Sequence, residues 1–220
     1  MTPQVRSGAL AWLGTQTLLR VLPAAALKRL GSAISQVRYA KGETIYNELE
    51  HPRQLWILKE GRVRLLRHSS AGRVFAFPIA TRGSVFCIAG LMNQCPYPCR
   101  AVADTDTVLF KITASAFHQL LKCYPAFGCE ALKVVCQECC RAHALCSSSQ
   151  ERVEQRLLGA LAQLFDEFGP MIPLGRQQVA ELVGVSRETA NRILLKLQAQ
   201  GVVKLAFQRL VIRNPAKLRS

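Results

Sequence analysis

The segment from residue 173 to residue 215 constrains the fold more than any other part of the chain. It reads PLGRQQVAELVGVSRETANRILLKLQAQGVVKLAFQRLVIRNP. A short helix is expected over residues 176–183, followed by Gly184 at a turn that favours a positive φ, and Ser186 can cap the next helix. The apolar face of that second helix contains Val185, Ile193, Leu194 and Leu197. This spacing predicts a helix-turn-helix.

A basic hairpin is expected directly after the second helix. Gly201 ends the helix, and VVKL and RLVIR, separated by AFQ, predict a two-stranded wing. On the side of the helix opposite its apolar face, the first turns present Arg187, Glu188, Asn191 and Arg192. Arginine can bind guanine O6 and N7 together, and glutamate can accept a hydrogen bond from cytosine N4. The pattern therefore favours recognition of base edges in a major groove.

The net charge of +15 on 220 residues indicates a polyanionic partner, with nucleic acid favoured over a membrane surface. From Pro170 to Ser220 only Glu181 and Glu188 oppose nine basic residues, which are Arg176, Arg187, Arg192, Lys196, Lys204, Arg209, Arg213, Lys217 and Arg219. The tail is the more basic part of the chain per residue. It is therefore the part in which a nucleic-acid contact is expected.

Residues 15 to 38 are expected to be helical, and from Tyr39 the pattern changes to short apolar runs separated by turn residues. Runs of about five residues, split by Lys-Gly, Glu-Gly, Ala-Gly and Arg-Gly, predict an antiparallel barrel or jelly roll. We expect this barrel to span residues 38–112. Thr113 is a candidate N-cap for the helix that follows.

A long helix is expected from Pro125 to about residue 149. Steps of three and four residues place one stripe on it, formed by Cys129, Leu132, Cys136, Cys139, His143 and Cys146. A stripe of this kind needs a partner helix. Because the helix is single and is expected to protrude from the barrel, its own copy in a homodimer is the predicted partner.

These elements together resemble the bacterial cyclic-AMP receptor protein / fumarate-nitrate regulator (CRP/FNR) family of transcription factors. The resemblance rests on Ser186-Arg187-Glu188-Thr189 with Arg192, and on the barrel pattern YAKGETIYNELE followed by LWILKEGRVRLL. It implies an α+β chain divided into a jelly-roll sensor domain (1–122), a dimerisation helix (123–149) and a winged helix-turn-helix (150–220). It also implies a pseudo-palindromic double-stranded DNA site and RNA polymerase as a partner. The predicted DNA contacts are Arg187, Glu188, Thr189, Asn191, Arg192, Gln178, Arg176 and Lys196.

The sensor domain departs from the cyclic-AMP-binding members of this family. Those members hold the ribose and phosphate with a Gly-Glu pair and an Arg-Ser pair, and alignment places Cys87-Ile88 and Tyr97-Pro98 at these positions. No carboxylate is left for the ribose and no arginine for the phosphate, and Pro98 lacks a backbone donor. The alignment therefore argues against cyclic AMP binding of the usual kind. A displaced phosphate contact from Arg100 is the alternative.

All nine cysteines lie between Cys87 and Cys146, and three interpretations of them are open. As small apolar residues they can pack a helix seam. As soft ligands they can bind an iron–sulfur cluster or another metal through Cys123, Cys129, Cys136 and Cys139. As a thiol switch they can form disulfides across the seam or between Cys95 and Cys99. The redox candidates are Cys87, Cys95, Cys99, Cys140 and Cys146.

Other classes of protein fit the sequence less well. No apolar run approaches the roughly 20 residues of a membrane span and no export signal is recognisable, which predicts a cytoplasmic protein with reduced thiols. No cysteine has a catalytic His/Asp constellation, so we expect no enzyme. A homodimeric, sequence-specific DNA-binding regulator with a cysteine-rich sensor region is predicted. The alternative is a small-molecule-responsive or effector-independent regulator whose cysteines only pack the seam.

Overall fold

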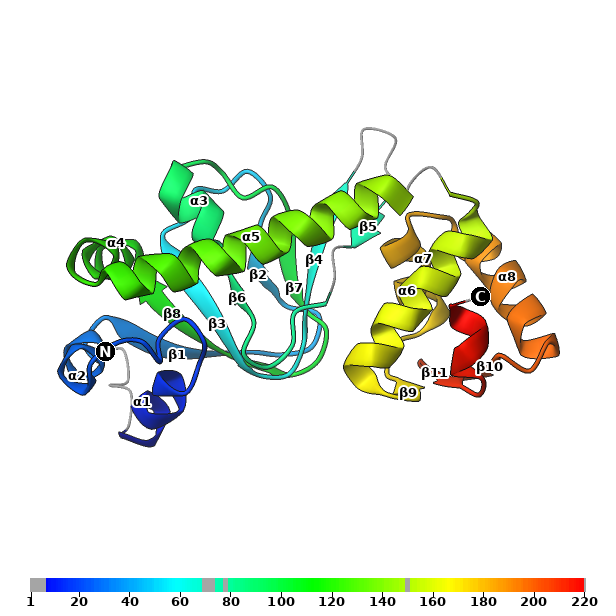
Figure 1. Ribbon diagram of the computed structural model, residues 1–220, viewed down its shortest axis with the longest axis horizontal. Coiled ribbons are helices and arrows are strands. Elements are labelled where there is room, and N and C mark those ends of the chain that lie inside the picture. The colour runs from blue at the N-terminus through cyan, green and yellow to red at the C-terminus, as the bar shows by residue number, and fades with distance from the viewer. Residues whose placement is uncertain (1–6, 69–73, 77–78, 149–150, 220) are drawn as a thin grey trace. The chain divides into compact units, whose positions relative to one another are not determined.

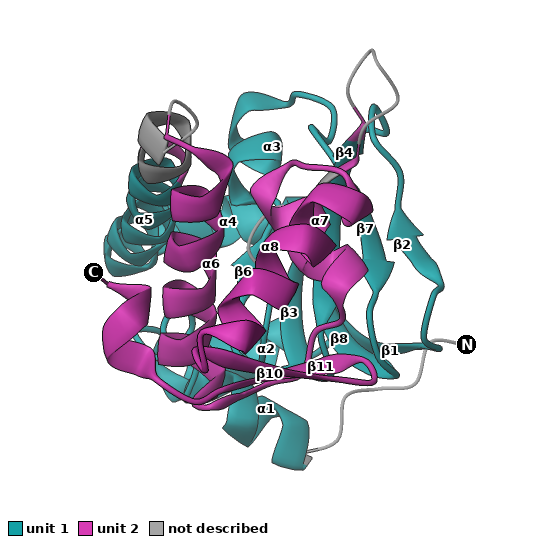
Figure 2. Ribbon diagram, turned by 90° about the vertical axis from the view of Figure 1, so that its right-hand side faces the viewer, with its two compact units in different colours: residues 1–67, 78–141 teal, residues 68–77, 142–220 magenta. Residues whose placement is uncertain are grey.

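The computed structural model describes residues 7–68, 74–76, 79–148 and 151–219 (Figure 1). Its contacts divide the chain into two compact units, one of residues 1–67 with 78–141 and the other of residues 68–77 with 142–220 (Figure 2). Each unit has its own buried core. The predicted division into 1–122, 123–149 and 150–220 stays a prediction, and the first unit contains the long helix as far as residue 141.

Two sheets form the barrel of the first unit. One sheet has the order β1 (Ile34–Tyr39), β8 (Thr107–Thr113), β3 (Gln54–Glu60) and β6 (Val85–Phe86). The other contains β2 (Thr44–Tyr46), β7 (Arg100–Ala103) and β4 (Val63–His68), and β5 (Val74–Ala76) follows β4 along the chain. The pairs β1-β8, β3-β8, β3-β6, β2-β7 and β4-β7 are antiparallel. The predicted jelly roll is confirmed.

Strand β3 has buried residues on both faces, and this explains its continuous apolar run. Trp56 and Leu58 belong to the cluster inside the barrel. Leu55 and Ile57 belong to a second cluster, in which helices cover the outer face of the same sheet. Because successive side chains of a strand point to opposite faces, a strand between two cores needs apolar residues at every position.

Among the described residues, the first unit contains the helices α1 (Ser7–Gly14), α2 (Ala24–Leu30), α3 (Ile88–Asn93) and α4 (Ala114–Cys123). It also contains α5 (Pro125–Ser148) as far as residue 141. The predicted cap of α4 is present, since the Thr113 hydroxyl accepts a hydrogen bond of 3.3 Å from the Ala116 amide. Helix α5 begins at Pro125, as expected, and buries Phe127 and Ala131 in the outer cluster. No helix in the described ranges has the length and hydropathy of a membrane span.

The prediction of a helix over residues 15–38 is wrong for most of that range. Residues 15–22 form turns, only α2 is helical, and residues 34–39 are strand β1. Pro23 stands at the N-cap of α2, and helix α2 ends before Gly31. Strand β1 pairs with β8 in a register that sets Ile34 opposite Ile112. This pairing joins segments that are far apart in the chain, so it overrides local helix propensity.

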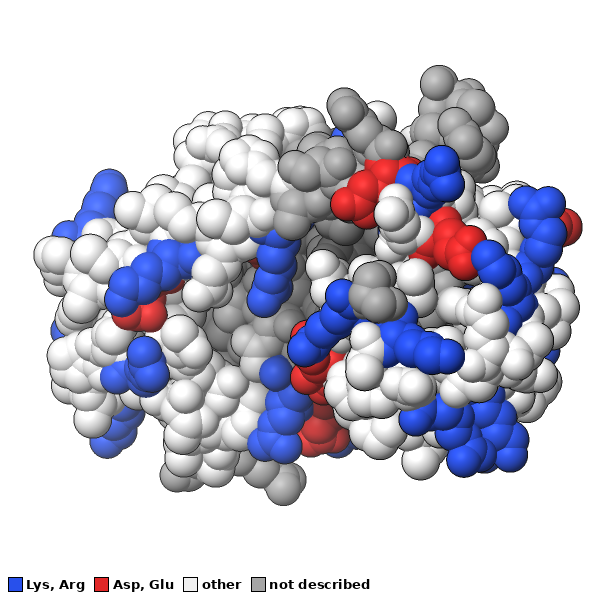
Figure 3. Space-filling model, turned by 45° about the vertical axis from the view of Figure 1, so that its right-hand side comes forward, with Lys and Arg blue, Asp and Glu red and all other residues white. Residues whose placement is uncertain are grey.

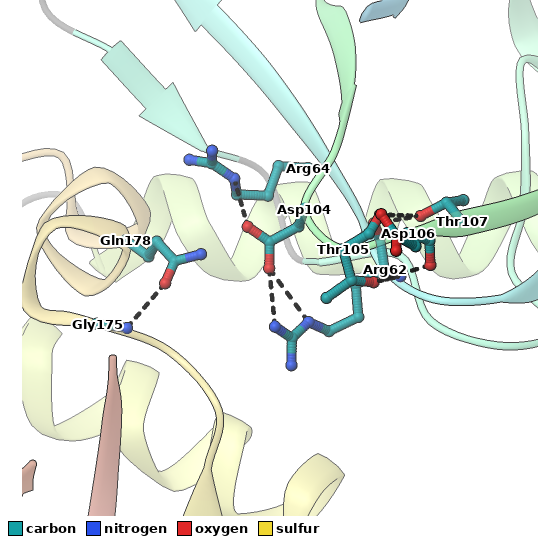
Figure 4. Close-up of polar contacts among 8 residues, drawn as sticks. All are labelled: Arg62, Arg64, Asp104, Thr105, Asp106, Thr107, Gly175 and Gln178. Atoms are coloured by element: carbon teal, nitrogen blue, oxygen red, sulfur yellow. Dashed lines mark hydrogen bonds and ion pairs between the residues drawn. The ribbon is translucent and has the colours of Figure 1, made fainter. Parts of the chain in front are cut away.

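The turn between β7 and β8 is held by a buried carboxylate (Figure 4). Asp104 is 5% exposed and lies 3.0 Å from a guanidinium nitrogen of each of Arg62 and Arg64. The neighbouring Gly61 has a φ of +87°, and a Cβ there would lie 2.4 Å from the Asp106 carbonyl oxygen. Glycine is therefore required where the β3-β4 turn approaches this loop.

The second unit contains the predicted helix-turn-helix and wing. Its elements are α6 (Val153–Phe168), β9 (Met171–Ile172), α7 (Arg176–Val183), α8 (Arg187–Ala199), β10 (Val203–Ala206), β11 (Arg209–Ile212) and a 3-10 helix (Pro215–Leu218). The sheet order is β10-β11-β9. Strand β9 was not expected, because a strand of two residues has no apolar pattern of its own.

Candidate DNA-binding surface and effector region

The turn between α7 and α8 has the geometry that the sequence predicts. Gly184 ends α7 with a φ of +71°, in the left-handed region. Ser186 caps α8, and its hydroxyl accepts a hydrogen bond of 3.2 Å from the Thr189 amide. The Thr189 hydroxyl lies 3.1 Å from the same oxygen. The start of α8 is therefore fixed by local hydrogen bonds before any ligand binds.

Helix α8 separates an apolar face from a polar one. Ala190, Leu194 and Leu197 are buried, while Val185 and Ile193 are half-buried beside them. Arg187, Glu188 and Arg192 are exposed. Two turns of one helix thus offer guanidinium donors and a carboxylate acceptor to a binding partner.

The Glu188 carboxyl group is ionised at neutral pH. Hydrogen bonds from its own backbone N–H and from the Ser186 side chain lower the pKa of Glu188 below its ordinary value of 4.5. A carboxylate only accepts hydrogen bonds, so it can bind the cytosine amino group but not a carbonyl edge. A carboxylate at this position can therefore distinguish amino groups from carbonyl groups in a binding partner.

Arg176 and Asn191 are joined by a hydrogen bond between the two helices. The Arg176 guanidinium donates to the Asn191 side-chain oxygen over 2.8 Å. Arg176 is exposed at the first position of α7, and Asn191 is half-buried on α8. The bond orients the Asn191 amide and keeps the positive charge of Arg176 beside the exposed face of α8.

Gln178 and Lys196 are held by partners within the unit. The Gln178 side-chain oxygen accepts a hydrogen bond of 2.8 Å from the Gly175 amide, which caps the start of α7 (Figure 4). The Lys196 ammonium lies 2.9 Å from Glu154 on α6. Sequence reasoning placed both at the DNA and missed these partners. The Gly175–Gln178 contact spans three residues and is a local capping box that the spacing could have identified, whereas Glu154 lies far from Lys196 in the chain.

The wing carries an exposed aromatic residue that sequence reasoning missed. Phe207 is 89% exposed in the turn between β10 and β11, and Gln208 beside it has a φ of +53°. Lys204 and Arg209 are exposed on the two strands. Basic side chains gather on this part of the molecule, at the right of the view in Figure 3. An apolar residue at the tip of a basic hairpin is the signal that could have identified Phe207.

Aromatic side chains fill the barrel interior near the positions aligned with the nucleotide cassette. The Tyr97 and Tyr46 rings stack with centroids 3.8 Å apart, and both residues are buried. Trp56 and Phe86 complete the group. Ile88 is 2% exposed and belongs to the apolar cluster outside the barrel sheet.

Cys87 lies at one of the aligned cassette positions, and Arg100 follows the other pair closely in the chain. The Arg100 Nε atom is buried and has no hydrogen-bond partner within the described residues. Cys87 precedes α3 with a φ of +81°, a conformation that favours glycine.

The barrel thiols are poor nucleophiles. Burial raises the pKa of the Cys87 thiol to about 12 and that of the Cys99 thiol to about 11. Because the thiolate is the reactive form, these two predicted redox candidates react slowly at neutral pH. Cys95 and Cys140 are exposed, and the side chain of Cys146 lies outside the described residues. None of the eight described cysteines forms a disulfide, Cys95 and Cys99 included.

The predicted stripe lies on the exposed face of α5. Its described side chains, Cys129, Leu132, Cys136, Cys139 and His143, are all exposed, and Leu132 is 59% exposed. Val134 and Val135 pack with Phe127 and Ala131 against the first unit. The helix therefore has one face on the barrel and another that the described residues leave uncovered.

The four predicted metal ligands do not converge within one chain. Cys123 ends α4, and Cys129, Cys136 and Cys139 follow on the continuous helix α5. At a rise of 1.5 Å per residue, Cys129 and Cys139 are separated by about 15 Å. No group of three or more candidate ligands gathers anywhere in the described residues. A single ion or cluster bound by all four from one chain is therefore excluded by the helix geometry.

Two family models match the chain. The cyclic nucleotide-binding domain matches residues 36–124, and the Crp-like helix-turn-helix domain matches residues 155–220. The first range covers the barrel with α3 and α4. The second covers α6 to the 3-10 helix, including the Ser186-capped helix.

Curated relatives align over most of the chain. The cyclic AMP receptor protein of Thermus thermophilus is 26% identical over 182 residues, which are 82% of this chain and 84% of that protein. The global nitrogen regulator of Synechocystis is 24% identical over 218 residues, which are 92% and 97% of the two chains. The second of these relatives is a regulator by name, and its alignment covers nearly the whole of both chains.

Solved structures share the fold. FixK2 of Bradyrhizobium japonicum superposes with a TM-score of 0.76 at 22% identity, over 84% of this chain and 96% of that one. The c-di-GMP responsive global regulator CLP of Xanthomonas campestris gives 0.77 at 20% identity, over 87% and 100%. With the helix-turn-helix geometry, both family matches and these relatives, the chain belongs to the CRP/FNR family of transcription regulators.

Proposed function

We propose that the protein is a homodimeric regulator that reads a specific DNA sequence through α8. The observation that carries this proposal is the first half of α8, where the Ser186 cap presents Arg187, Glu188 and Arg192 to solvent. A carboxylate among so many basic residues would weaken simple attraction to phosphates. Its place beside two arginines instead fits discrimination between base pairs.

Dimerisation through α5 is supported by the uncovered face of that helix. The stripe residues on that face are exposed and follow one another at steps of three and four, the spacing of a two-stranded coiled coil. A two-fold dimer would present two α8 helices to half-sites about 34–36 Å apart, one turn of DNA. The expected site is therefore pseudo-palindromic. RNA polymerase is a partner that the family implies.

Control by a signal other than cyclic AMP is supported by the barrel interior. The Tyr97 ring, stacked on Tyr46, lies at an aligned position where an arginine would bind phosphate. Buried Ile88 offers no carboxylate to a ribose hydroxyl. The buried Arg100 Nε has no hydrogen-bond partner among the described residues and could donate a hydrogen bond to an anionic effector.

A cavity in the first unit supports a small-molecule effector as the second candidate. It has a volume of about 310 Å³ and lies between the barrel and α5. Leu18, Leu65 and Phe86 supply apolar surface, while Glu138 and Arg141 supply charge. Burial raises the pKa of Glu138 above its ordinary value. A mixed apolar and charged cavity of this size suits a small organic ligand.

The decisive experiment is selection of binding sites from a random DNA library, followed by fluorescence anisotropy at fixed salt. We expect an enriched two-fold motif and affinity for it that exceeds non-specific affinity by at least about 10³-fold. Equal affinity for all sequences would overturn the proposal. Repeating the titration with cyclic AMP, for the wild type and for Arg100→Ala, tests the signal. An affinity increase that disappears in Arg100→Ala would show that the barrel binds cyclic AMP after all.

A further inference from the structure

Cys136 and Cys139 lie one helical turn apart on the uncovered face of α5. Both side chains are exposed, and neither forms a disulfide. Three residues along a helix bring two side chains to neighbouring positions on the same face. Both residues belong to the stripe, with Leu132 one turn before them and His143 one turn after.

The dimer proposed above determines where these thiols meet, so this inference rests on that proposal. In a parallel pair of helices related by a two-fold axis, each stripe residue faces its own copy across the seam. Two adjacent layers of the seam would then each contain two cysteines. Four sulfur atoms would surround one point on the axis.

We infer that Cys136 and Cys139 of the two copies form a site for one soft divalent metal ion of the zinc class. A zinc–thiolate bond is about 2.3 Å long, so the sulfurs of a tetrahedral site lie about 3.8 Å apart. The two layers are separated by about 4.5 Å along the helix axis. Side-chain rotation alone can close the difference. Four thiolates also complete the coordination of a structural zinc ion.

The other cysteines of α5 do not fit the same site. Cys129 lies about 10 Å from Cys136 along the helix. Cys140 is rotated by about 100° around the axis from Cys139, toward the edge of the seam. An iron–sulfur cluster in place of a single ion would have to push the two helices apart, because its sulfur ligands surround several iron atoms.

Such an ion would couple metal binding to dimerisation. The thiols release protons when they bind the metal, and neither oxidant nor reductant is consumed. Because the complete site exists only in the dimer, the metal stabilises the dimer by mass action. Removal of the metal is expected to weaken the dimer without abolishing it, since Leu132 and the other stripe residues remain.

The test uses the full-length protein, treated with chelator and kept reduced under anaerobic conditions. Zinc is added alone, and native mass spectrometry counts ions and chains, while sedimentation measures dimerisation with and without zinc. We expect one ion per two chains. Cobalt in place of zinc is expected to give the visible absorption of tetrahedral thiolate coordination.

Matched variants distinguish this site from other thiols. Cys136→Ser and Cys139→Ala each remove two of the four ligands of the dimer. Loss of a residue that only supports a ligand can lower metal affinity by about 100-fold. Loss of two ligands is expected to lower zinc affinity by more than that. Cys140→Ser and Cys95→Ser are expected to keep the ion. Helical circular dichroism of each variant shows whether it is folded.

Each remaining outcome contradicts the site in a different way. A dimer that binds no zinc would overturn the metal site and leave the proposed dimer intact. A chain that stays monomeric with and without zinc would overturn both. One ion per chain, iron with sulfide in the purified protein, or loss of zinc only in Cys140→Ser would each assign the thiols to another kind of site.

Discussion

The guanidinium of Arg176 and the side-chain oxygen of Asn191 are 2.8 Å apart and join the first positions of α7 to the middle of α8. Both residues lie on the face proposed to contact DNA. The bond holds a positive charge in place without burying it. Arg176 could therefore affect DNA binding in two ways, through its own charge and through the orientation of the Asn191 amide. A binding experiment can distinguish the two.

Arg176→Ala should weaken binding to all DNA sequences by a similar factor. Loss of one phosphate contact reduces the slope of log affinity against log salt by about 0.9. Arg176→Lys keeps the charge and is expected to keep the salt slope. Anisotropy titrations at several salt concentrations measure both. A changed base preference in Arg176→Ala would instead indicate that Arg176 acts through Asn191.

Glu188→Ala should relax the preference at one position of each half-site. The carboxylate accepts from the cytosine amino group, and one such contact contributes about 1–3 kcal/mol of discrimination. Binding to a set of sites with single base changes measures the effect. Glu181→Ala, on α7 and outside the proposed contacts, serves as the control. A uniform change at all positions would argue against base recognition by Glu188.

Ser186→Ala should lower the free energy of unfolding by about 1 kcal/mol, because the Thr189 amide loses its capping acceptor. Ser186→Asn keeps a capping oxygen and is expected to stay near the wild type. Urea unfolding followed by circular dichroism compares the three proteins. Equal stability of the Ala and Asn variants would show that the cap does not stabilise α8.

Phe207→Ala should weaken DNA binding while leaving unfolding unchanged. The side chain is 89% exposed in the free protein, so its removal costs no core packing. If the wing tip contacts DNA, burial of the ring contributes up to about 1.5–3 kcal/mol. Leu49→Ala, another exposed apolar residue at 75% exposure in the first unit, is the control. Unchanged affinity in Phe207→Ala would exclude the wing tip from the interface.

Cys99 should make the protein less stable as the pH rises above about 9. Burial raises the pKa of the folded thiol from 9.0 to about 11, so the unfolded chain loses this proton first. The unfolded state then binds fewer protons, and the free energy of unfolding falls by at most about 1.4 kcal/mol per pH unit between these values. Cys99→Ala should show a shallower decline in urea unfolding at several pH values.

The same burial predicts slow labelling of the barrel thiols. Cys99 and Cys87 should react with a thiol reagent at neutral pH more slowly than exposed Cys95, as peptide mass spectrometry can measure. Fast labelling of Cys99 would contradict the raised pKa and return Cys99 to the redox candidates.

Local signals were sufficient to predict the helix-turn-helix of the second unit. A cap at Ser186, a left-handed turn at Gly184 and the apolar positions of α8 each act within a few residues, so the sequence alone predicted the helix-turn-helix. The same holds for Thr113 and Pro125, which mark the starts of α4 and α5. The resemblance to the family could be recognised from these residues because their spacing along the chain determines the helix ends and the turn.

Tertiary structure decided what depends on residues far apart in the chain. Residues 34–39 are a strand because β8 pairs with them, from Ile34 opposite Ile112 to Tyr39 opposite Thr107, and no local pattern reveals so distant a partner. The contacts of Tyr97 with Tyr46 and of Lys196 with Glu154 likewise join residues that are far apart in the chain. Local propensity determines which elements can form, whereas packing determines which side chains meet and which thiols stay exposed.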